Sequence, residues 1–193
     1  MTPRAKRPPK RVTPAYLKNV ALHYLEQRSS SRSNLRRLLV RRVDRSLAEH
    51  GGERDEHVGW VDALLDELVR LQLLDDATYA AQRARSFSRM GNGSRKIRAK
   101  LAEKGVPSVL VDAALAQLQG DGPSPDLVAA CRFARSRKLG PFRRDAHEPR
   151  DREARQKELA KLGRAGFSYE IAIRVIDCES AEMIDEMMTT VDA

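Results

Sequence analysis

Residues 74–107 read LDDATYAAQRARSFSRMGNGSRKIRAKLAEKGVP and carry the start and stop signals of three short helices. Asp75-Asp76 is typical of a helix N-terminus, where a carboxylate accepts hydrogen bonds from free backbone N–H groups. Gly91-Asn92-Gly93 breaks this helix, and Gly105 stops the next one. Pro107 then opens a third helix, because proline fits the first positions of a helix. The stretch therefore predicts a unit of three short helices.

The end of the middle helix recurs later in the chain. LAEKGVP, residues 101–107, superposes on LGRAGFS, residues 162–168, and both have a helix that ends at Gly, one apolar residue and a new helix start. Thr13-Pro14 and Ser124-Pro125 are equivalent helix starts. We therefore expect a disordered basic tail over residues 1–12, followed by three-helix repeats over residues 13–74, 75–121 and 122–193, the last with a C-terminal tail.

Apolar spacing gives the remaining helices. The pattern predicts a helix over 14–27, a second that Ser33 caps and His50-Gly51-Gly52 ends, and a third from Asp55 with Leu71 on its apolar face. Ser94 caps the basic helix of the second unit, and Ile97 and Leu101 lie on its core-facing side. Residues 138–150 are predicted to be a loop, and a basic helix follows over about 151–164. Ser168 caps the last predicted helix. No stretch alternates with period two, so we expect an all-α fold.

Charge alternates along the chain. The chain has 193 residues and a net charge of +9, and 27 of its 36 basic residues are Arg. Residues 1–45 hold 13 basic and two acidic residues, whereas residues 46–82 hold two and nine. The same alternation follows twice more, with basic stretches at 83–104 and 132–164. A basic tail on a neutral body would not give this pattern, which again favours three related units.

Several functional classes find no support in the sequence. No apolar run reaches the roughly 18 residues that a membrane span needs. The four histidines share no metal-ligand spacing, and Cys131 and Cys178 stand apart, so we expect no metal, no cofactor and a reducing cytoplasm. No acid or nucleophile cluster predicts catalysis, so we expect neither an enzyme nor a small-molecule substrate.

The basic helices are the candidate binding surface. Their bases outnumber the acids on the same helix, so pairs within one helix cannot neutralise them. Arg also favours bidentate contacts to phosphate or carboxylate. The candidate residues for binding a polyanion or an acidic protein groove are Arg32, Arg36, Arg37, Arg41, Arg95, Lys96, Arg98, Lys100, Lys104, Arg143, Arg144 and Arg155.

The central motif resembles the signature of the RecX family. The matching positions are Leu74, Asp75, Asp76, Tyr79, Ala80, Gly91, Gly93, Ile97, Leu101, Lys104, Gly105, Val106, Ala114 and Leu115, with Arg164, Ala165, Gly166, Phe167 and Ser168 in the third unit. The resemblance covers residues 14–178, although the first unit matches in pattern more than in motif. Glu158 stands where the second unit has Ile97.

The resemblance implies both a fold and a partner. The fold is three tandem three-helix repeats in an elongated, curved body. The implied function is that of a monomeric cytoplasmic regulator that binds RecA recombinase and its single-stranded-DNA filament. It would mainly inhibit recombinase, ATPase and coprotease activity, and so regulate DNA repair and recombination. Its basic helices would meet either acidic recombinase surface or DNA phosphates. The alternative from charge alone is a general DNA-binding or nucleoid-associated helical protein.

Overall fold

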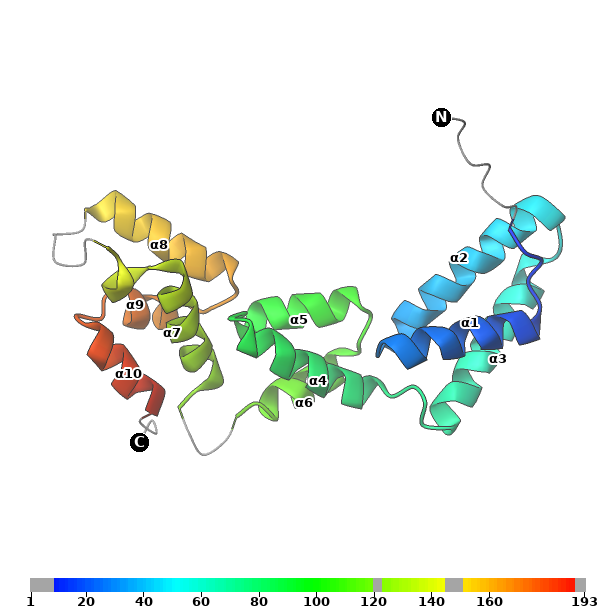
Figure 1. The fold of residues 1–193 in the computed structure, drawn as a ribbon, viewed down its shortest axis with the longest axis horizontal. Helices are drawn as coiled ribbons and strands as arrows, with labels where there is room; N and C mark the ends of the chain where they lie inside the picture. The colour runs from blue at the N-terminus through cyan, green and yellow to red at the C-terminus, as the bar shows by residue number, and fades with distance from the viewer. Residues whose placement is uncertain (1–8, 120–122, 145–150, 190–193) are drawn as a thin grey trace. The chain divides into compact units, whose positions relative to one another are not determined.

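The computed structural model describes residues 9–119, 123–144 and 151–189. These ranges hold ten α-helices and one 3-10 turn, with no β-strand. The predicted all-α fold is therefore confirmed (Figure 1). Contacts divide the chain into two compact units, one of residues 1–79 with 104–106 and one of the remaining residues. The division into three repeats stays a prediction.

The first unit packs α1 (Pro14–Gln27), α2 (Arg32–His50) and α3 (Arg54–Arg70) around one apolar core. Thr13 caps α1 as predicted, since its side chain accepts a hydrogen bond from the Tyr16 N–H. The core includes the completely buried side chains of Leu17, Leu35, Leu39 and Leu65.

Two predictions at helix ends in the first unit are wrong. Ser31, and not Ser33, caps α2 by accepting from the Asn34 N–H, so the helix begins two residues earlier than the spacing suggested. Leu71 is 54% exposed because α3 ends at Arg70 and Gln72 adopts a left-handed conformation (φ 57°), which turns the chain away from the core.

The predicted disordered tail over residues 1–12 is too long at its C-terminal end. Residues 1–8 lie outside the described residues, but Val12 is buried in the core of the first unit. Its N–H donates to the buried Ser46 Oγ at 2.9 Å. Because this pairing satisfies a backbone group inside the core, Val12 belongs to the packed structure.

The second unit begins within α4 (Asp76–Arg89), followed by α5 (Ser94–Glu103) and α6 (Ser108–Ala116). Ile97 and Leu101 of α5 are completely buried, as the four-residue spacing predicted. Ser94 is the first residue of α5 and not its cap. Its N–H and Oγ instead donate to the Asp126 carboxylate, at 2.9 and 2.7 Å.

The rest of the second unit packs α7 (Pro125–Arg137), α8 (Arg152–Arg164), α9 (Tyr169–Ile176) and α10 (Ala181–Thr189) around a separate core. The predicted loop over 138–150 contains a short 3-10 turn (Gly140–Phe142), while residues 145–150 lie outside the described ranges. Leu139 before this turn is buried, which fixes the chain against the core.

The two superposable turns of the sequence make equivalent contacts. The turn at Lys104 and Gly105 lies against the N-terminus of α2, where Ser31 Oγ donates to the Lys104 carbonyl at 2.5 Å. The turn at Ala165 and Gly166 lies against the N-terminus of α5, where the Gly93 N–H donates to the Ala165 carbonyl at 2.9 Å.

An acid completes each of these two contacts. Asp76 Oδ1 accepts from the Arg32 N–H at 2.6 Å, and Asp126 occupies the same place at Ser94. We call each combination of turn, helix N-terminus and acid a joint. Each joint supplies hydrogen-bond partners to a helix N-terminus, whose first N–H groups have none within the helix.

Candidate polyanion-binding surface

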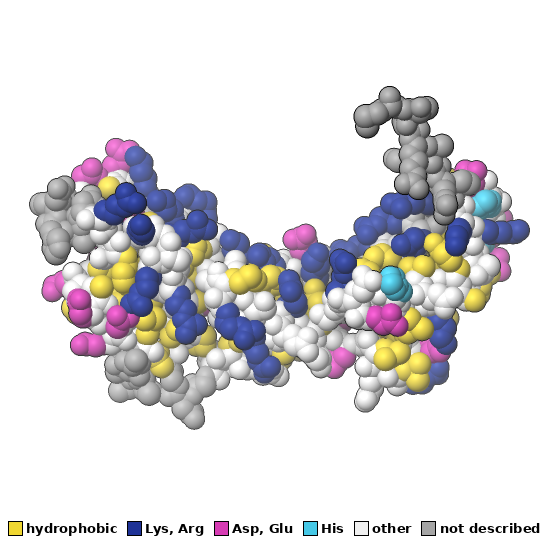
Figure 2. Space-filling view, in the orientation of Figure 1, with side chains coloured by type: hydrophobic (Ala, Val, Ile, Leu, Met, Phe, Trp, Pro, Cys, Tyr) yellow, Lys and Arg dark blue, Asp and Glu magenta, His cyan; other side chains and the backbone are white. Residues whose placement is uncertain are grey.

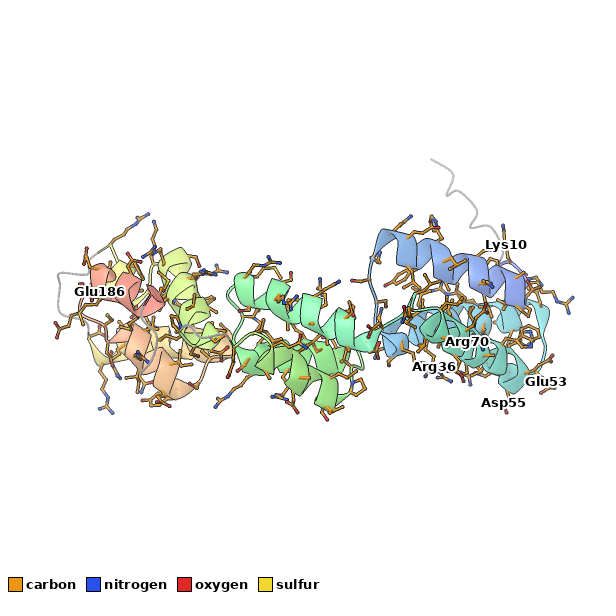
Figure 3. All side chains as sticks on the ribbon, turned by 90° about the horizontal axis from the view of Figure 1, so that it is seen from below. Lys10, Arg36, Glu53, Asp55, Arg70 and Glu186 are labelled. Carbon is orange, nitrogen blue, oxygen red and sulfur yellow. The ribbon has the colours of Figure 1, made fainter. Side chains whose placement is uncertain are left out.

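The candidate arginines on α2 are partly neutralised by α3. Arg36 forms a two-point ion pair with Asp62, with Nε–Oδ1 at 2.6 Å and Nη2–Oδ2 at 2.9 Å (Arg36 is labelled in Figure 3). Arg32 pairs with Asp66 at 2.5 Å. The hydrogen bond from Arg36 lowers the pKa of Asp62 below its ordinary 3.8, against a smaller opposing effect of burial.

The same arrangement recurs in the second unit. Arg98 of α5 pairs with Asp112 of α6, and Arg155 of α8 pairs with Asp177 at the end of α9. The hydrogen bond to Asp177 raises the pKa of Arg155. In each case a basic helix is paired with acids on or at the end of the next helix. This pairing between helices explains much of the charge alternation in the sequence.

Other candidates keep their charge available. Arg41, Arg95 and Arg144 are exposed and make no salt bridge with any residue that the structure describes. The Lys100 ammonium lies 4.4 Å from the centre of the Phe87 ring. Within each unit taken separately, Lys and Arg side chains gather over α2, and over α5 and α8 (Figure 2).

The remaining candidates are held closer to the protein. Arg143 Nε donates to the Gly140 carbonyl at 3.3 Å, and Lys104 is half-buried at its joint. Arg37 is exposed but makes contacts within the chain. The twelve candidate residues are thus spread over both units.

The residues of the family motif have structural roles in the core, at helix ends and at the joints. Leu74, Tyr79, Ile97, Leu101 and Phe167 are buried. Asp75 caps α4, accepting from the backbone N–H groups of residues 77 and 78, and Ser168 caps α9 in the same way. Gly91, Gly105 and Gly166 all have positive φ, and Gly93 and Asp76 take part in the joints.

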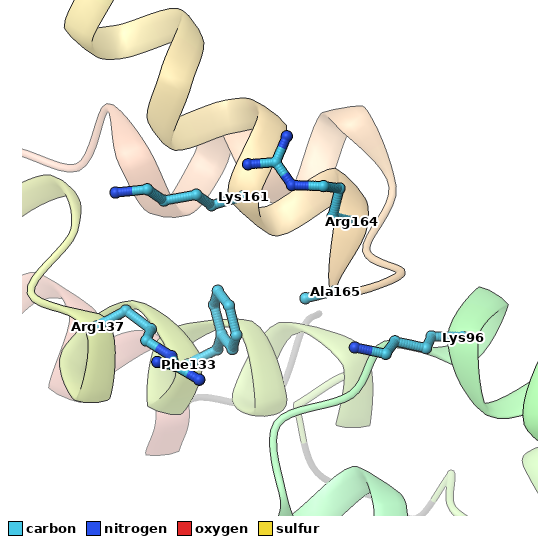
Figure 4. A pocket seen from close by; sticks show the side chains of 6 residues that line it. All are labelled: Lys96, Phe133, Arg137, Lys161, Arg164 and Ala165. Atoms are coloured by element: carbon cyan, nitrogen blue, oxygen red, sulfur yellow. The ribbon is translucent and has the colours of Figure 1, made fainter.

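A cationic cleft in the second unit collects four basic side chains. It has a volume of about 530 Å³ and lies between α5, α7 and α8 (Figure 4). Its lining residues are Lys96, Phe133, Arg137, Lys161, Arg164 and Ala165. None of them is acidic. None of the four cations forms a salt bridge with a described residue, although the Arg137 guanidinium lies 5.8 Å from the centre of the Phe133 ring.

The sequence predicted only Lys96 among these cations. Arg137, Lys161 and Arg164 come from two further helices, and no local spacing brings them to Lys96. The available signal was weak: Lys161 and Arg164 are three residues apart and so share one face of α8. The contact at the Gly166 turn brings that face to α5, which only the tertiary structure shows.

The described residues contain no group of three or more His, Cys, Asp or Glu that could hold a metal ion. Among the same residues, no helix is long and apolar enough to cross a membrane. Fold and cleft together define a class: an all-α protein of short helices with separate small cores and a cationic cleft.

Comparison with known proteins gives the family. The family model of the second three-helix domain of RecX matches residues 75–115. This range contains α4, α5 and all of α6 except its last residue. The regulatory protein RecX of Myxococcus xanthus (strain DK1622) is 45% identical over 92% of this chain and 93% of its own length. That of Agrobacterium fabrum (strain C58 / ATCC 33970) is 33% identical over 89% and 87%. The chain therefore belongs to the RecX family of regulatory proteins.

Solved structures share the fold of this chain. The crystal structure of RecX from Lactobacillus salivarius has a TM-score of 0.63 at 21% identity, covering 90% of this chain and 97% of that chain. A crystal structure of a regulatory protein RecX has a TM-score of 0.62 at 26% identity, covering 86% and 72%. The predicted resemblance to the RecX family is confirmed.

Proposed function

We propose that this protein binds RecA recombinase and RecA–single-stranded-DNA filaments, and that it mainly inhibits their recombinase, ATPase and coprotease activities. It acts as a monomer in the cytoplasm, and it is a binding protein with no catalytic activity of its own. Through this inhibition it regulates DNA repair and recombination. The observation that carries the proposal is the 45% identity to a regulatory protein RecX along nearly the whole chain.

The charge distribution supports such a role. Paired arginines, such as Arg36 and Arg155, stabilise the helix pairs and have little charge left for a partner. Arg41 and Arg95 are exposed and without salt bridges to described residues, so their charges are free to meet recombinase carboxylates or DNA phosphates. Exposed complementary charge mainly accelerates association and selects the partner.

The test is DNA-dependent ATP hydrolysis by the recombinase at about one molecule of this protein to ten of recombinase. We expect clear inhibition by the natural protein. Arg41→Gln combined with Arg95→Gln should raise the concentration for half-inhibition about tenfold, because two favourable contacts of roughly 0.5–1 kcal/mol each are lost.

The matched control is Arg54→Gln combined with Lys157→Gln. It removes the same charge from two exposed residues that are not among the twelve candidates, each of which pairs with a neighbouring acid. This control should inhibit like the natural protein. The proposal fails if the natural protein neither inhibits hydrolysis nor cosediments with preformed filaments.

A further inference from the structure

We propose that the cleft between α5, α7 and α8 is a binding site for the polyphosphate group of a nucleotide-sized ligand. The inference concerns this chain alone and requires no recombinase. It starts from four cations, Lys96, Arg137, Lys161 and Arg164, around one space that no acidic residue among the described ones lines (Figure 4). Like charges gathered in this way repel one another, and an anion between them removes that repulsion.

Helix stability explains only some of these cations. Arg137, Lys161 and Arg164 lie in the last turns of α7 and α8, where positive charge interacts favourably with the helix dipole. Lys96 lies in the first turn of α5, where positive charge is unfavourable. The stability of α5 therefore does not explain why a lysine lies at this position on the cleft.

The cleft is built on fixed backbone contacts. The Gly93 N–H donates to the Ala165 carbonyl at 2.9 Å, and the Arg95 N–H donates to the Gly166 carbonyl at 3.3 Å. Gly166 has φ +95°, and a Cβ there would lie 2.5 Å from the Lys96 backbone nitrogen. Only glycine allows this approach, which holds Lys96 opposite the end of α8. The backbone of the site is thus arranged before a ligand arrives.

Charge density favours a polyphosphate over a strand or an acidic peptide. A nucleoside triphosphate carries three to four negative charges on adjacent groups, which matches the four cations that line one space. A nucleic-acid strand carries one charge per nucleotide, and an acidic peptide spreads its carboxylates along the chain. Arginine also binds phosphate oxygens through two parallel hydrogen bonds.

Size and apolar surface fit the rest of a nucleotide. A volume of about 530 Å³ lies within the roughly 300–1,000 Å³ of small-ligand sites. Phe133 is partly buried beside Phe167, at 6.0 Å between ring centres, and also borders the cleft. Its ring offers a face on which a base can stack.

The experiment is titration of the full chain with ATP, AMP, inorganic triphosphate and a six-residue oligothymidylate, followed by calorimetry at about 50 mM salt. We expect ATP to bind at least tenfold more tightly than AMP. Lys161→Gln combined with Arg164→Gln should weaken ATP binding at least tenfold, because charge-assisted hydrogen bonds are lost. Arg152→Gln combined with Lys157→Gln removes the same charge from α8 outside the cleft and should change it less than twofold.

Phe133→Leu separates the two parts of the site. Leucine keeps the side chain apolar but removes the aromatic ring. The affinity for inorganic triphosphate should therefore stay within twofold. ATP should no longer bind more tightly than triphosphate, because its base has lost the ring on which it stacks. Circular dichroism confirms that each variant remains helical.

Three results would overturn the proposal: equal affinity for ATP and AMP, ATP binding unchanged in the Lys161 and Arg164 variant, or binding of the oligonucleotide but not of triphosphate. The last result would identify a nucleic-acid surface instead. Because the titration contains no recombinase, none of these results bears on the inhibition assay.

Discussion

Gly105 shows how one residue can determine a contact between distant segments. It has φ +73°, and a Cβ at this position would overlap the Ser33 side chain. Gly105→Ala should therefore destabilise the protein by about 1–3 kcal/mol, from backbone strain and the lost approach of α2. Urea unfolding measures the change.

Gly163→Ala is the control for that substitution. Gly163 lies within α8, and a Cβ there would meet no atom within 4 Å. Alanine is the better helix former, so this variant should be neutral or up to about 1 kcal/mol more stable. Equal effects at Gly105 and Gly163 would contradict the close contact at Ser33.

The two cysteines should differ in reactivity. Cys131 is 1% exposed, and burial raises the pKa of its thiol to about 11. The thiolate is the reactive form, so Cys131 should be almost inert at pH 8, whereas the partly exposed Cys178 is accessible. Titration with Ellman's reagent should release one equivalent rapidly from native protein and two after unfolding. Two fast equivalents from native protein would show that Cys131 is not protected.

Residue-level prediction worked where the signal was local. The four-residue spacing of Ile97 and Leu101 placed both correctly in the core, since a helix brings such positions to one face. Glu158 could not be placed in this way. It is buried, and its Oε1 accepts from the Gly140 N–H at 3.4 Å, a partner 18 residues away. Sequence spacing carries no information on such a contact.

The α2–α3 pair should respond to pH through Asp62. Arg36→Gln removes the hydrogen bond that lowers the pKa of Asp62, so this pKa should rise toward 3.8. A lowered pKa in the folded state means that the pair stabilises the protein above pH 3.8, and that this contribution is lost as the pH falls through the lowered value. Since both side chains are about 40% exposed, the effect should stay below about 1 kcal/mol.

Two measurements follow this pair. NMR titration of the Asp62 carboxyl carbon reports its pKa in the natural protein and the variant. Urea unfolding at pH 7 and at pH 2 reports stability, and the two proteins should differ at pH 7 and converge at pH 2. A difference that persists undiminished at pH 2 would assign it to packing and not to charge.

Helix limits were predictable from caps, with instructive exceptions. Thr13, Asp75 and Ser168 were correct because a cap is a contact between residues three apart or closer. Ser31 and Ser33 are equally good caps by type. Ser31 is the one whose hydroxyl also donates to the Lys104 carbonyl, 73 residues away. Local sequence spacing gives no sign of a contact between residues so far apart.

At the scale of the whole molecule, the net charge of +9 predicts some binding to any nucleic acid. A regulator of filaments should nevertheless bind bare duplex DNA weakly, with affinity falling steeply between 50 and 200 mM salt as counterions compete. Its affinity for RecA filaments should fall much less over the same range, because protein contacts contribute. Fluorescence anisotropy with labelled duplex and labelled filament compares the two.

The opposite outcome favours the other function. Tight duplex binding at 200 mM salt, with filament binding no stronger, would indicate a general DNA-binding protein. The charge pattern alone does not distinguish these functions. Some of the charges form pairs within the protein, such as Arg98 with Asp112. Only the structure distinguishes these paired charges from exposed ones such as that of Arg95.

The joints also have a consequence for the order of folding. They connect Ser31 with Lys104 and Gly93 with Ala165, whereas the helices that they position are made of local contacts. Closing a long loop costs conformational entropy before the hydrogen bonds at its ends can compensate for that cost. Local helix pairs should therefore form early and the joints late. Substitutions at the joints, including Gly105→Ala, should then accelerate unfolding while leaving the rate of folding almost unchanged.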